Sequence, residues 1–366
     1  MFERFKIRID VYSLLRILCA ILIAFTCTII MILCFSDVPL LAMQKFFFGA
    51  FTTKRNFFNI IEKMIPLVFA GLSLNVIQKA GLANLVADGA LYIGAVIAAV
   101  VAISLKLPKG IHTGTAILIS GIVGGVITLI PAILKKITGV WEMVVAIMLN
   151  TVFFYVGQFI INNGFLDEVA GYASYKFNPT AKLGNMIKGT QTHFGLIIMI
   201  IAYILVVILM DKTRFGYQLK VVGSNIKYAK NSGINVFAVI MISQFIGGFL
   251  AGAGGAVEML GMYDRFLWST PVSFVWDAVL LDILAGANAK FIPVAAFFFA
   301  YVRVGAGIMS RGTDLDQEIV AIIQAIIIFL VSAERFMYNF KKKREAKQAL
   351  AEKEKALQVE AANIQN

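Results

Sequence analysis

The residues of this chain that could do chemistry are acids and amides set within apolar sequence. Asn84, Asp88, Asn150 and Asp277 lie in stretches long enough to cross a membrane, and Trp276 directly precedes Asp277. A charged side chain at the middle of a membrane costs about 2.5–3.5 kcal/mol on insertion scales. We therefore predict that these five residues line a polar pathway, with hydrogen bonding between helices as the alternative for each.

The spacing of these residues adds two specific expectations. Asp88 follows Asn84 by four residues, which would place both on one face of a helix. Trp276 beside Asp277 could offer an aromatic face and a hydrogen-bond acceptor to a ring-shaped polar solute. Both expectations concern binding rather than bond-making chemistry.

Motifs for catalysis are missing from the sequence. It has no Ser-His-Asp or Cys-His arrangement and no glycine-rich nucleotide loop that ends in Lys-Ser or Lys-Thr. Its two histidines stand far apart, without a cluster of cysteines or carboxylates beside them. We predict no catalytic residue, no metal site and no cofactor. The glycine pairs Gly248 with Gly252 and Gly121 with Gly125 instead indicate close packing of membrane helices.

The composition is that of a membrane protein. Of the 366 residues, 60% are hydrophobic and only 15% are charged, and the mean hydropathy is +0.84. The net charge of +12 then marks cytoplasmic loops and contacts with membrane lipids, so we expect no nucleic-acid partner. The predicted fold is an all-α polytopic membrane protein.

About ten transmembrane helices are expected, within a range of eight to eleven, because a span needs about 20 mostly apolar residues. The predicted spans are 13–35, 59–77, 82–104, 113–134, 141–162, 194–210, 234–256, 271–288, 291–309 and 317–334. The first is read as an uncleaved helix. Around 257–290, short and glycine-interrupted stretches leave half-helices or re-entrant segments as an alternative.

Charge sets the predicted orientation. With both termini in the cytoplasm, 20 of the 33 Lys and Arg residues fall inside and 10 outside, as the positive-inside rule requires. The domains are then a cytoplasmic N-terminus (1–12), a transmembrane permease domain (13–334) and a charged cytoplasmic tail (335–366). Within the permease domain, 163–193 is an external loop and 211–233 is a cytoplasmic loop.

Four stretches carry a resemblance to a known family. They are AGLANLVADGALYIGA (80–95), TRFGYQLKVVGSNIKYAKNSGI (213–234), FLAGAGGAVEMLG (249–261) and FVWDAVLLDILAGANAKFIPV (274–294). The chain resembles the membrane permeases of ATP-binding cassette (ABC) importers for ribose and other simple sugars, nucleosides and branched-chain amino acids. It is most similar to the nucleoside and simple-sugar permeases that work with a basic-membrane-protein type lipoprotein.

The resemblance implies a role for the cytoplasmic loop. In the family this segment docks on the ATPase subunit and passes its movement to the membrane helices. The residues that would do so here are Thr213, Phe215, Gly216, Gly223, Asn225 and Gly233. We expect the three glycines to shape the turns of this segment.

The resemblance also implies the partners and the location. The ATPase, with two P-loops, would be a separate subunit, beside a second permease that is homologous or identical and an extracytoplasmic solute-binding lipoprotein. The complex would lie in the bacterial cytoplasmic (inner) membrane. Asp88 stands where nucleoside-type members usually have Glu, and Asp282 is an additional acid. A nucleoside is the favoured solute, with a simple sugar or riboflavin as alternatives. A stand-alone secondary transporter is disfavoured because the two halves show no self-similarity.

Overall fold

The computed structural model describes residues 26, 29–171, 173–187, 189–272, 274–315, 322, 325 and 326. Across these residues the regular structure is helical, with two isolated β-bridges, Leu166 to Ser174 and Asn185 to His193, and no β-strand. Most of the predicted spans 13–35 and 317–334, and all of the tail 335–366, lie outside the described residues. The chain divides into two compact units, and the unit Gln44–Gly312 holds the elements discussed below.

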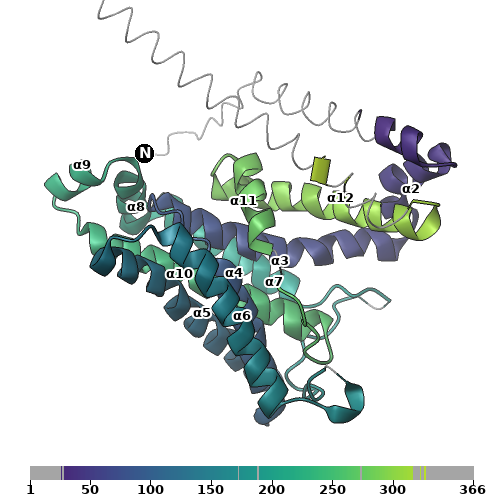
Figure 1. The fold of residues 1–366 in the computed structure, drawn as a ribbon, viewed down its shortest axis with the longest axis horizontal. Coiled ribbons are helices and arrows are strands. Elements are labelled where there is room, and N and C mark those ends of the chain that lie inside the picture. The colour runs from purple at the N-terminus through teal and green to yellow at the C-terminus, as the bar shows by residue number, and fades with distance from the viewer. Residues whose placement is uncertain are drawn as a thin grey trace, which may run out of the picture. The chain divides into compact units, whose positions relative to one another are not determined.

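The longer helices of this part of the chain follow the predicted apolar stretches. The helix bounds are α2 Pro39–Thr52, α3 Lys54–Lys79, α4 Ala87–Ser104, α5 Ile111–Thr138, α6 Glu142–Gly164, α7 Gly195–Lys212, α8 Arg214–Ser224, α9 Ile226–Asn231, α10 Val236–Met262, α11 Phe274–Ala285 and α12 Ile292–Gly312 (Figure 1). Helices α2, α8 and α9 correspond to no predicted span. Short 3-10 helices occupy Glu168–Ala170 (η1) and Ala289–Phe291 (η2). Among the described residues, seven segments are long and apolar enough to cross a membrane: α3, α4, α5, α6, α7, α10 and η2 with α12.

Helix α10 packs against α3, α4 and α5 through backbone contacts that only glycine permits. A Cβ atom on Gly252 would meet the backbone of Ser120 and lie 3.2 Å from the Cα of Gly124 on α5, and one on Gly94 of α4 would meet Gly252. A Cβ on Gly248 would meet the carbonyl oxygen of Gly124 and the side chain of Thr128, both on α5. Small residues let helices approach closely in lipid, where the hydrophobic effect does not drive helices together. The predicted packing role of these glycines is confirmed.

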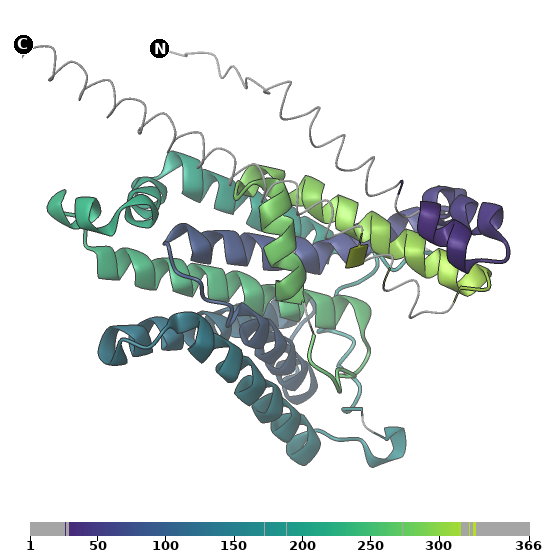
Figure 2. The same cartoon turned by 45° about the horizontal axis from the view of Figure 1, so that its top comes forward.

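Helix α11 is too short to be a span. Its 12 residues reach about 18 Å at 1.5 Å per residue, whereas the hydrocarbon core is about 30 Å thick. The prediction of a full span over 271–288 is therefore wrong, and the alternative of a half-helix applies. Figure 2 shows α11 as a short ribbon that is steeply inclined to the longer α12.

Helix α4 also begins later than predicted. Residues 82–85 are not helical, and the helix starts at Ala87 rather than at 82. The side chain of Asn84 accepts a hydrogen bond from Val86 N at 3.0 Å, a local bond that competes with helix formation. Asn84 and Asp88 consequently do not share one helical face, contrary to the expectation from their spacing.

Residues from several loops contact α3 near each of its two ends. Near its last residue, Lys79, lie Gly223 of α8 and the polar cavity that also contains Asp211 and Lys290. Near its first turn, Thr192 donates a hydrogen bond to Phe58 O. The loop 163–193 is joined there to 263–266 by the ion pair of Arg265 with Asp167. Below, these are called the Lys79 end and the Asp167 end.

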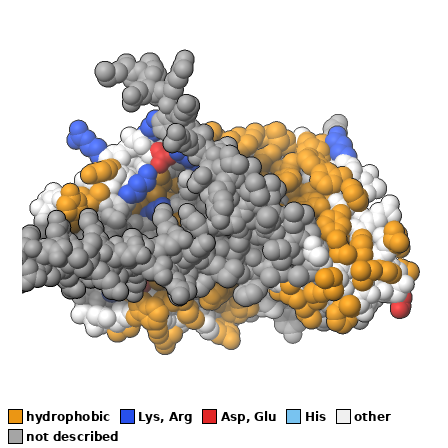
Figure 3. All heavy atoms as spheres, turned by 90° about the horizontal axis from the view of Figure 1, so that it is seen from above, with side chains coloured by type: hydrophobic (Ala, Val, Ile, Leu, Met, Phe, Trp, Pro, Cys, Tyr) orange, Lys and Arg blue, Asp and Glu red, His pale blue; other side chains and the backbone are white. Residues whose placement is uncertain are grey.

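The described surface of the protein is largely apolar. Large hydrophobic side chains of α5, α6 and α7 are exposed, among them Ile122, Phe159 and Leu205. On the face in Figure 3, hydrophobic side chains cover most of the described area, and most Lys and Arg side chains gather at one side. Such a surface is suited to contact with lipid or with another membrane subunit.

Candidate functional site

The carboxylate of Asp88 lies where two helices begin. Asp88 is in the first turn of α4, and its Oδ1 accepts a hydrogen bond from Val275 N, in the first turn of α11, at 3.4 Å. Helix N-termini carry partial positive charge, which stabilises a carboxylate placed between them. Non-helical backbone at membrane depth is tolerated only where protein or water covers it. The segments 82–85 and 263–272 thus bring two helix starts together around one acid.

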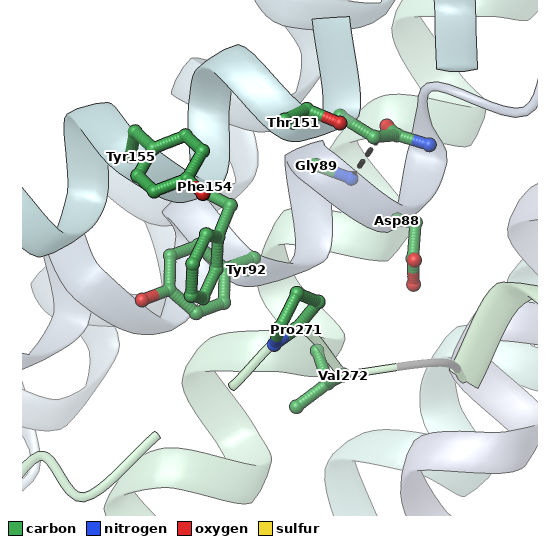
Figure 4. Close-up of a pocket in the computed structure, with 9 residues that line it drawn as sticks. Asp88, Gly89, Tyr92, Thr151, Phe154, Tyr155, Pro271 and Val272 are labelled. Atoms are coloured by element: carbon green, nitrogen blue, oxygen red, sulfur yellow. Dashed lines mark hydrogen bonds between the residues drawn. The ribbon is translucent and has the colours of Figure 1, made fainter. Parts of the chain in front are cut away.

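A hollow of about 210 Å³ opens beside Asp88 (Figure 4). It is lined by Asp88, Gly89, Tyr92, Asn150, Thr151, Phe154, Tyr155, Pro271 and Val272. The rings of Tyr92 and Phe154 lie 5.1 Å apart, and in Figure 4 they stand apart from the Asp88 carboxylate, with Pro271 and Val272 on the facing segment. The hollow therefore combines aromatic faces with a carboxylate that can accept hydrogen bonds.

Asn150 lines the same hollow but has its own polar atoms in use. Its Oδ1 accepts a hydrogen bond from Gly89 N at 2.9 Å, and its Nδ2 donates to Leu85 O at 3.0 Å. The Gly89 N–H is one of the groups that a helix leaves without an internal partner in its first turn. Asn150 therefore ties the start of α4 to α6 and holds Asp88 in place.

Asn84 lies away from the hollow, between helices. Its Nδ2 donates to Gln244 Oε1 at 2.8 Å and to Thr128 O at 3.2 Å, and its side chain is fully buried. A buried amide with these partners joins α10 and α5 to the segment before α4. This geometry favours the alternative of hydrogen bonding between helices.

Trp276 and Asp277 are not among the residues that line the hollow. The carboxylate of Asp277 pairs with Arg303 of α12 at 2.5 Å, and Trp276 is 51% exposed. Neighbouring residues on a helix point in directions about 100° apart. The geometry therefore does not support joint binding of one solute by this pair.

The loop 211–233, predicted to be cytoplasmic, contains two short helices with side-chain caps. The Thr213 hydroxyl accepts a hydrogen bond from Gly216 N at 3.1 Å, which caps α8. The Asn225 side chain accepts one from Tyr228 N at 3.0 Å, which caps α9. Thr and Asn are favoured at this position because their oxygens satisfy free N–H groups of the first turn. Phe215 lies half-buried in the first turn of α8.

The three glycines of this segment do different things. Only Gly233, with φ of +77°, shapes a turn that other residues would resist. Gly216 and Gly223 lie within α8. A Cβ on Gly216 would meet the carbonyl groups of Leu209 and Met210, and one on Gly223 would meet the carbonyl oxygen of Lys79. The expectation that all three shape turns is wrong for these two, which permit close backbone contact instead.

A second hollow, of about 590 Å³, lies along these helices. Arg214, Tyr217, Gln218, Val221 and Tyr228 line it together with neighbouring residues. Tyr217, Tyr228 and Ile226 are exposed. Aromatic side chains on a basic surface are typical of sites that bind another protein.

Comparison with known proteins now decides the family. Residues 56–332 match the family described as the branched-chain amino acid transport system permease component. The chain belongs to this family of ABC transporter permeases.

Three relatives of this permease cover most of its length. The nucleoside ABC transporter permease protein NupB of Lactococcus lactis subsp. cremoris is 28% identical over 331 residues, which cover 87% of this chain and 90% of that protein. The guanosine ABC transporter permease protein NupP of Bacillus subtilis is 28% identical, with 78% and 84% covered. The glucose ABC transporter permease protein TsgB13 of Haloferax volcanii is 26% identical, with 81% and 82% covered. The resemblance to nucleoside and simple-sugar permeases is confirmed, and the permease is a multi-pass protein of the cytoplasmic membrane.

Sequence reasoning missed the aromatic lining of the permease. Tyr92, Phe154 and Tyr155 lie in apolar runs and look like ordinary core residues until the fold places them beside Asp88. A weak signal was present, because Tyr92 carries a hydroxyl within an otherwise apolar helix. That hydroxyl accepts a hydrogen bond from Gln158 Nε2 at 2.8 Å. Buried tyrosine hydroxyls usually need such partners.

Proposed function

We propose that this permease forms the translocation pathway for a nucleoside or a similar small polar solute in an ATP-driven importer. The observation that carries the proposal is the meeting of Asp88, Tyr92 and Phe154 at the starts of α4 and α11. Half-helix N-termini near the middle of a membrane are a recurrent way of building a solute site. An aromatic face suits a base, and a carboxylate suits N–H or hydroxyl donors.

The pathway is narrow in this structure. A volume of about 210 Å³ is below the roughly 300–1,000 Å³ of most small-ligand pockets. Passage of a solute therefore needs the contact between Asp88 and the start of α11 to open. The names of the relatives NupB and NupP support a nucleoside, and that of TsgB13 supports a simple sugar as the alternative. Riboflavin is a further alternative.

The source of energy would be a partner subunit. We place the Lys79 end, with α8 and α9, on the cytoplasmic side, where an ATPase with two P-loops would dock on Tyr217, Ile226 and Tyr228. An identical or homologous second permease would pack on the apolar surface, and a solute-binding lipoprotein would meet the Asp167 end. Both termini would lie in the cytoplasm, with about ten spans in the whole chain, and the ATPase alone would hydrolyse ATP.

One reconstitution experiment tests this assignment. The permease is purified with the ATPase and the second permease encoded beside it, and placed in liposomes with the binding protein. Uptake is measured for tritiated guanosine, glucose and riboflavin, together with ATP hydrolysis. Asp88→Asn should lower uptake about tenfold, the loss expected for one hydrogen bond to a charged group. Gly223→Ala should keep hydrolysis but lose uptake, because its Cβ would push α8 away from Lys79.

Two matched controls accompany these variants. Asp37→Asn removes an exposed acid outside the segments proposed to contact a partner, and Gly114→Ala adds a Cβ in a helix where nothing lies within 4 Å. Both should transport normally. Normal uptake by Asp88→Asn and Gly223→Ala would refute the proposal. Uptake by the permease alone, driven by an ion gradient, would favour a secondary transporter.

A further inference from the structure

One carboxylate joins two parts of the permease at the Lys79 end. Asp211, in the last turn of α7, lies with Oδ1 2.8 Å from Lys220 Nζ and with Oδ2 2.7 Å from Lys290 Nζ. Lys220 belongs to α8, and Lys290 belongs to η2, between α11 and α12. Each of the two carboxylate oxygens thus reaches a different element.

The ion pairs cross a polar space rather than a packed interface. A cavity of about 240 Å³ lies between these elements, and residues 286–290 line it together with Asn75, Lys79, Asp211 and Lys220. Val207 and Met210 supply the large apolar side chains of the lining, and the other lining residues are polar or small. Relative movement of α8 and of the segment 286–290 therefore breaks few contacts here. Asp211 is the acid that links the two sides of the cavity.

The exposure of the three side chains makes the link reversible. Asp211 is 29% exposed, Lys220 47% and Lys290 42%. Ion pairs with this exposure stabilise a fold little, because water screens them and two side chains must be held in one geometry. A link of this kind can form in one state of a transport cycle and break in another at small cost.

Segment 286–290 is joined to the solute site through the length of α11. Gly286 and Ala287 both adopt left-handed backbone conformations, with φ of +71° and +53°, and so form a tight turn at the end of α11. Left-handed conformation is disfavoured for alanine, so the turn is held by its surroundings. A bond of 2.6 Å from Asn75 Nδ2 to Asp282 Oδ1 ties the same end of α11 to α3. The other end of α11 carries Val275, whose N–H contacts Asp88.

We propose that Asp211 is a positioning residue that transmits movement of α8 to α11 through its ion pairs with Lys220 and Lys290. The proposal rests on the proposed function, in which an ATPase moves α8. Displacement of α8 shifts Asp211 and Lys290, turns α11 about its Asn75 contact, and opens the space between Val275 and Asp88. Asp211 therefore acts on the pathway from a distance and does not touch the solute.

The test measures solute taken up per ATP hydrolysed by the complete complex in liposomes. The solute is whichever of guanosine, glucose and riboflavin the wild-type complex transports. Asp211→Asn should keep the hydrolysis rate within about twofold and lower uptake per ATP about fivefold, the size of effect expected for coupling between distant sites. Lys220→Gln and Lys290→Gln should each do the same, and Asp211→Glu should restore much of the coupling.

Asp264→Asn is the matched control for this ratio, because it also removes an acid paired with a lysine. A weaker contact with the binding protein there would lower uptake and ATP hydrolysis together. Asp264→Asn should therefore leave uptake per ATP unchanged. Normal coupling in Asp211→Asn, while Gly223→Ala is uncoupled, would overturn this inference and leave the proposed function intact. If Gly223→Ala is also coupled normally, the proposed function itself fails. An equal loss of hydrolysis and uptake in Asp211→Asn would assign Asp211 to assembly and refute transmission.

Discussion

The carboxylate of Asp277 on α11 lies 2.5 Å from the guanidinium group of Arg303 on α12. The Asp277 side chain is 15% exposed and that of Arg303 is 34% exposed, so the more buried carboxylate depends on the guanidinium group for its solvation. Loss of one partner leaves the other charge without compensation. The pair therefore fixes the half-helix α11 to the neighbouring span and does not offer Asp277 to a solute.

We expect Asp277→Asn and Arg303→Gln each to lower the free energy of unfolding by about 1–3 kcal/mol, the usual penalty for leaving a buried polar partner unsatisfied. The double variant should recover at least half of that loss, because it leaves no unpaired charge. Thermal unfolding midpoints in detergent measure the effect. Additive losses in the double variant would show that the two groups do not depend on each other.

The glycine contact of α10 with α5 gives a second prediction. Gly252→Ala places a methyl group against the backbone of Ser120 and Gly124. Overpacking of this kind typically costs about 1–3 kcal/mol, so the unfolding midpoint should fall. Gly307→Ala on α12 is the matched control, because a Cβ there would have no neighbour nearer than 3.9 Å. Equal midpoints for the two variants would mean that α10 and α5 can move apart without a loss of stability.

His193 predicts a dependence of stability on pH. Burial lowers the pKa of this side chain to about 4 from its usual 6.5. Its Nδ1 accepts a hydrogen bond from Gly195 N at 3.1 Å, and its Nε2 is buried without a partner. Between pH 6.5 and 4, His193 is protonated in the unfolded chain but neutral in the folded chain. Stability should therefore fall as the pH drops from about 6.5 to 4, by about 3 kcal/mol in all at 1.36 kcal/mol per pH unit.

The measurement for His193 compares unfolding midpoints from pH 4 to 8. His193→Asn keeps an oxygen that can accept from Gly195 N but removes the titrating ring, so its midpoint should change less with acid. If the variant loses stability as steeply as the wild type, other groups govern the acid sensitivity.

The membrane class, most of the helix positions and the family could be predicted from the sequence. Hydropathy over 20 residues is a local property, and it located α3, α5, α6, α7 and α10 to within a few residues. Capping is equally local, which is why Thr213 and Asn225 in the family pattern coincide with helix starts. Glycine spacing likewise indicated close packing of helices, and the structure shows this packing between α10 and α5.

Only the tertiary structure decided what the polar residues do. Asp88 meets Val275 across 187 residues of sequence, and Asn75 meets Asp282 across 207. Nothing in a local window distinguishes an acid that lines a hollow, such as Asp88, from one that pairs with a cation, such as Asp277. The aromatic lining of the hollow and the ion pairs of Asp211 with Lys220 and Lys290 also arise from contacts between separate elements. Hydropathy depends on each residue alone, whereas the role of a buried charge depends on the partner that the fold brings to it.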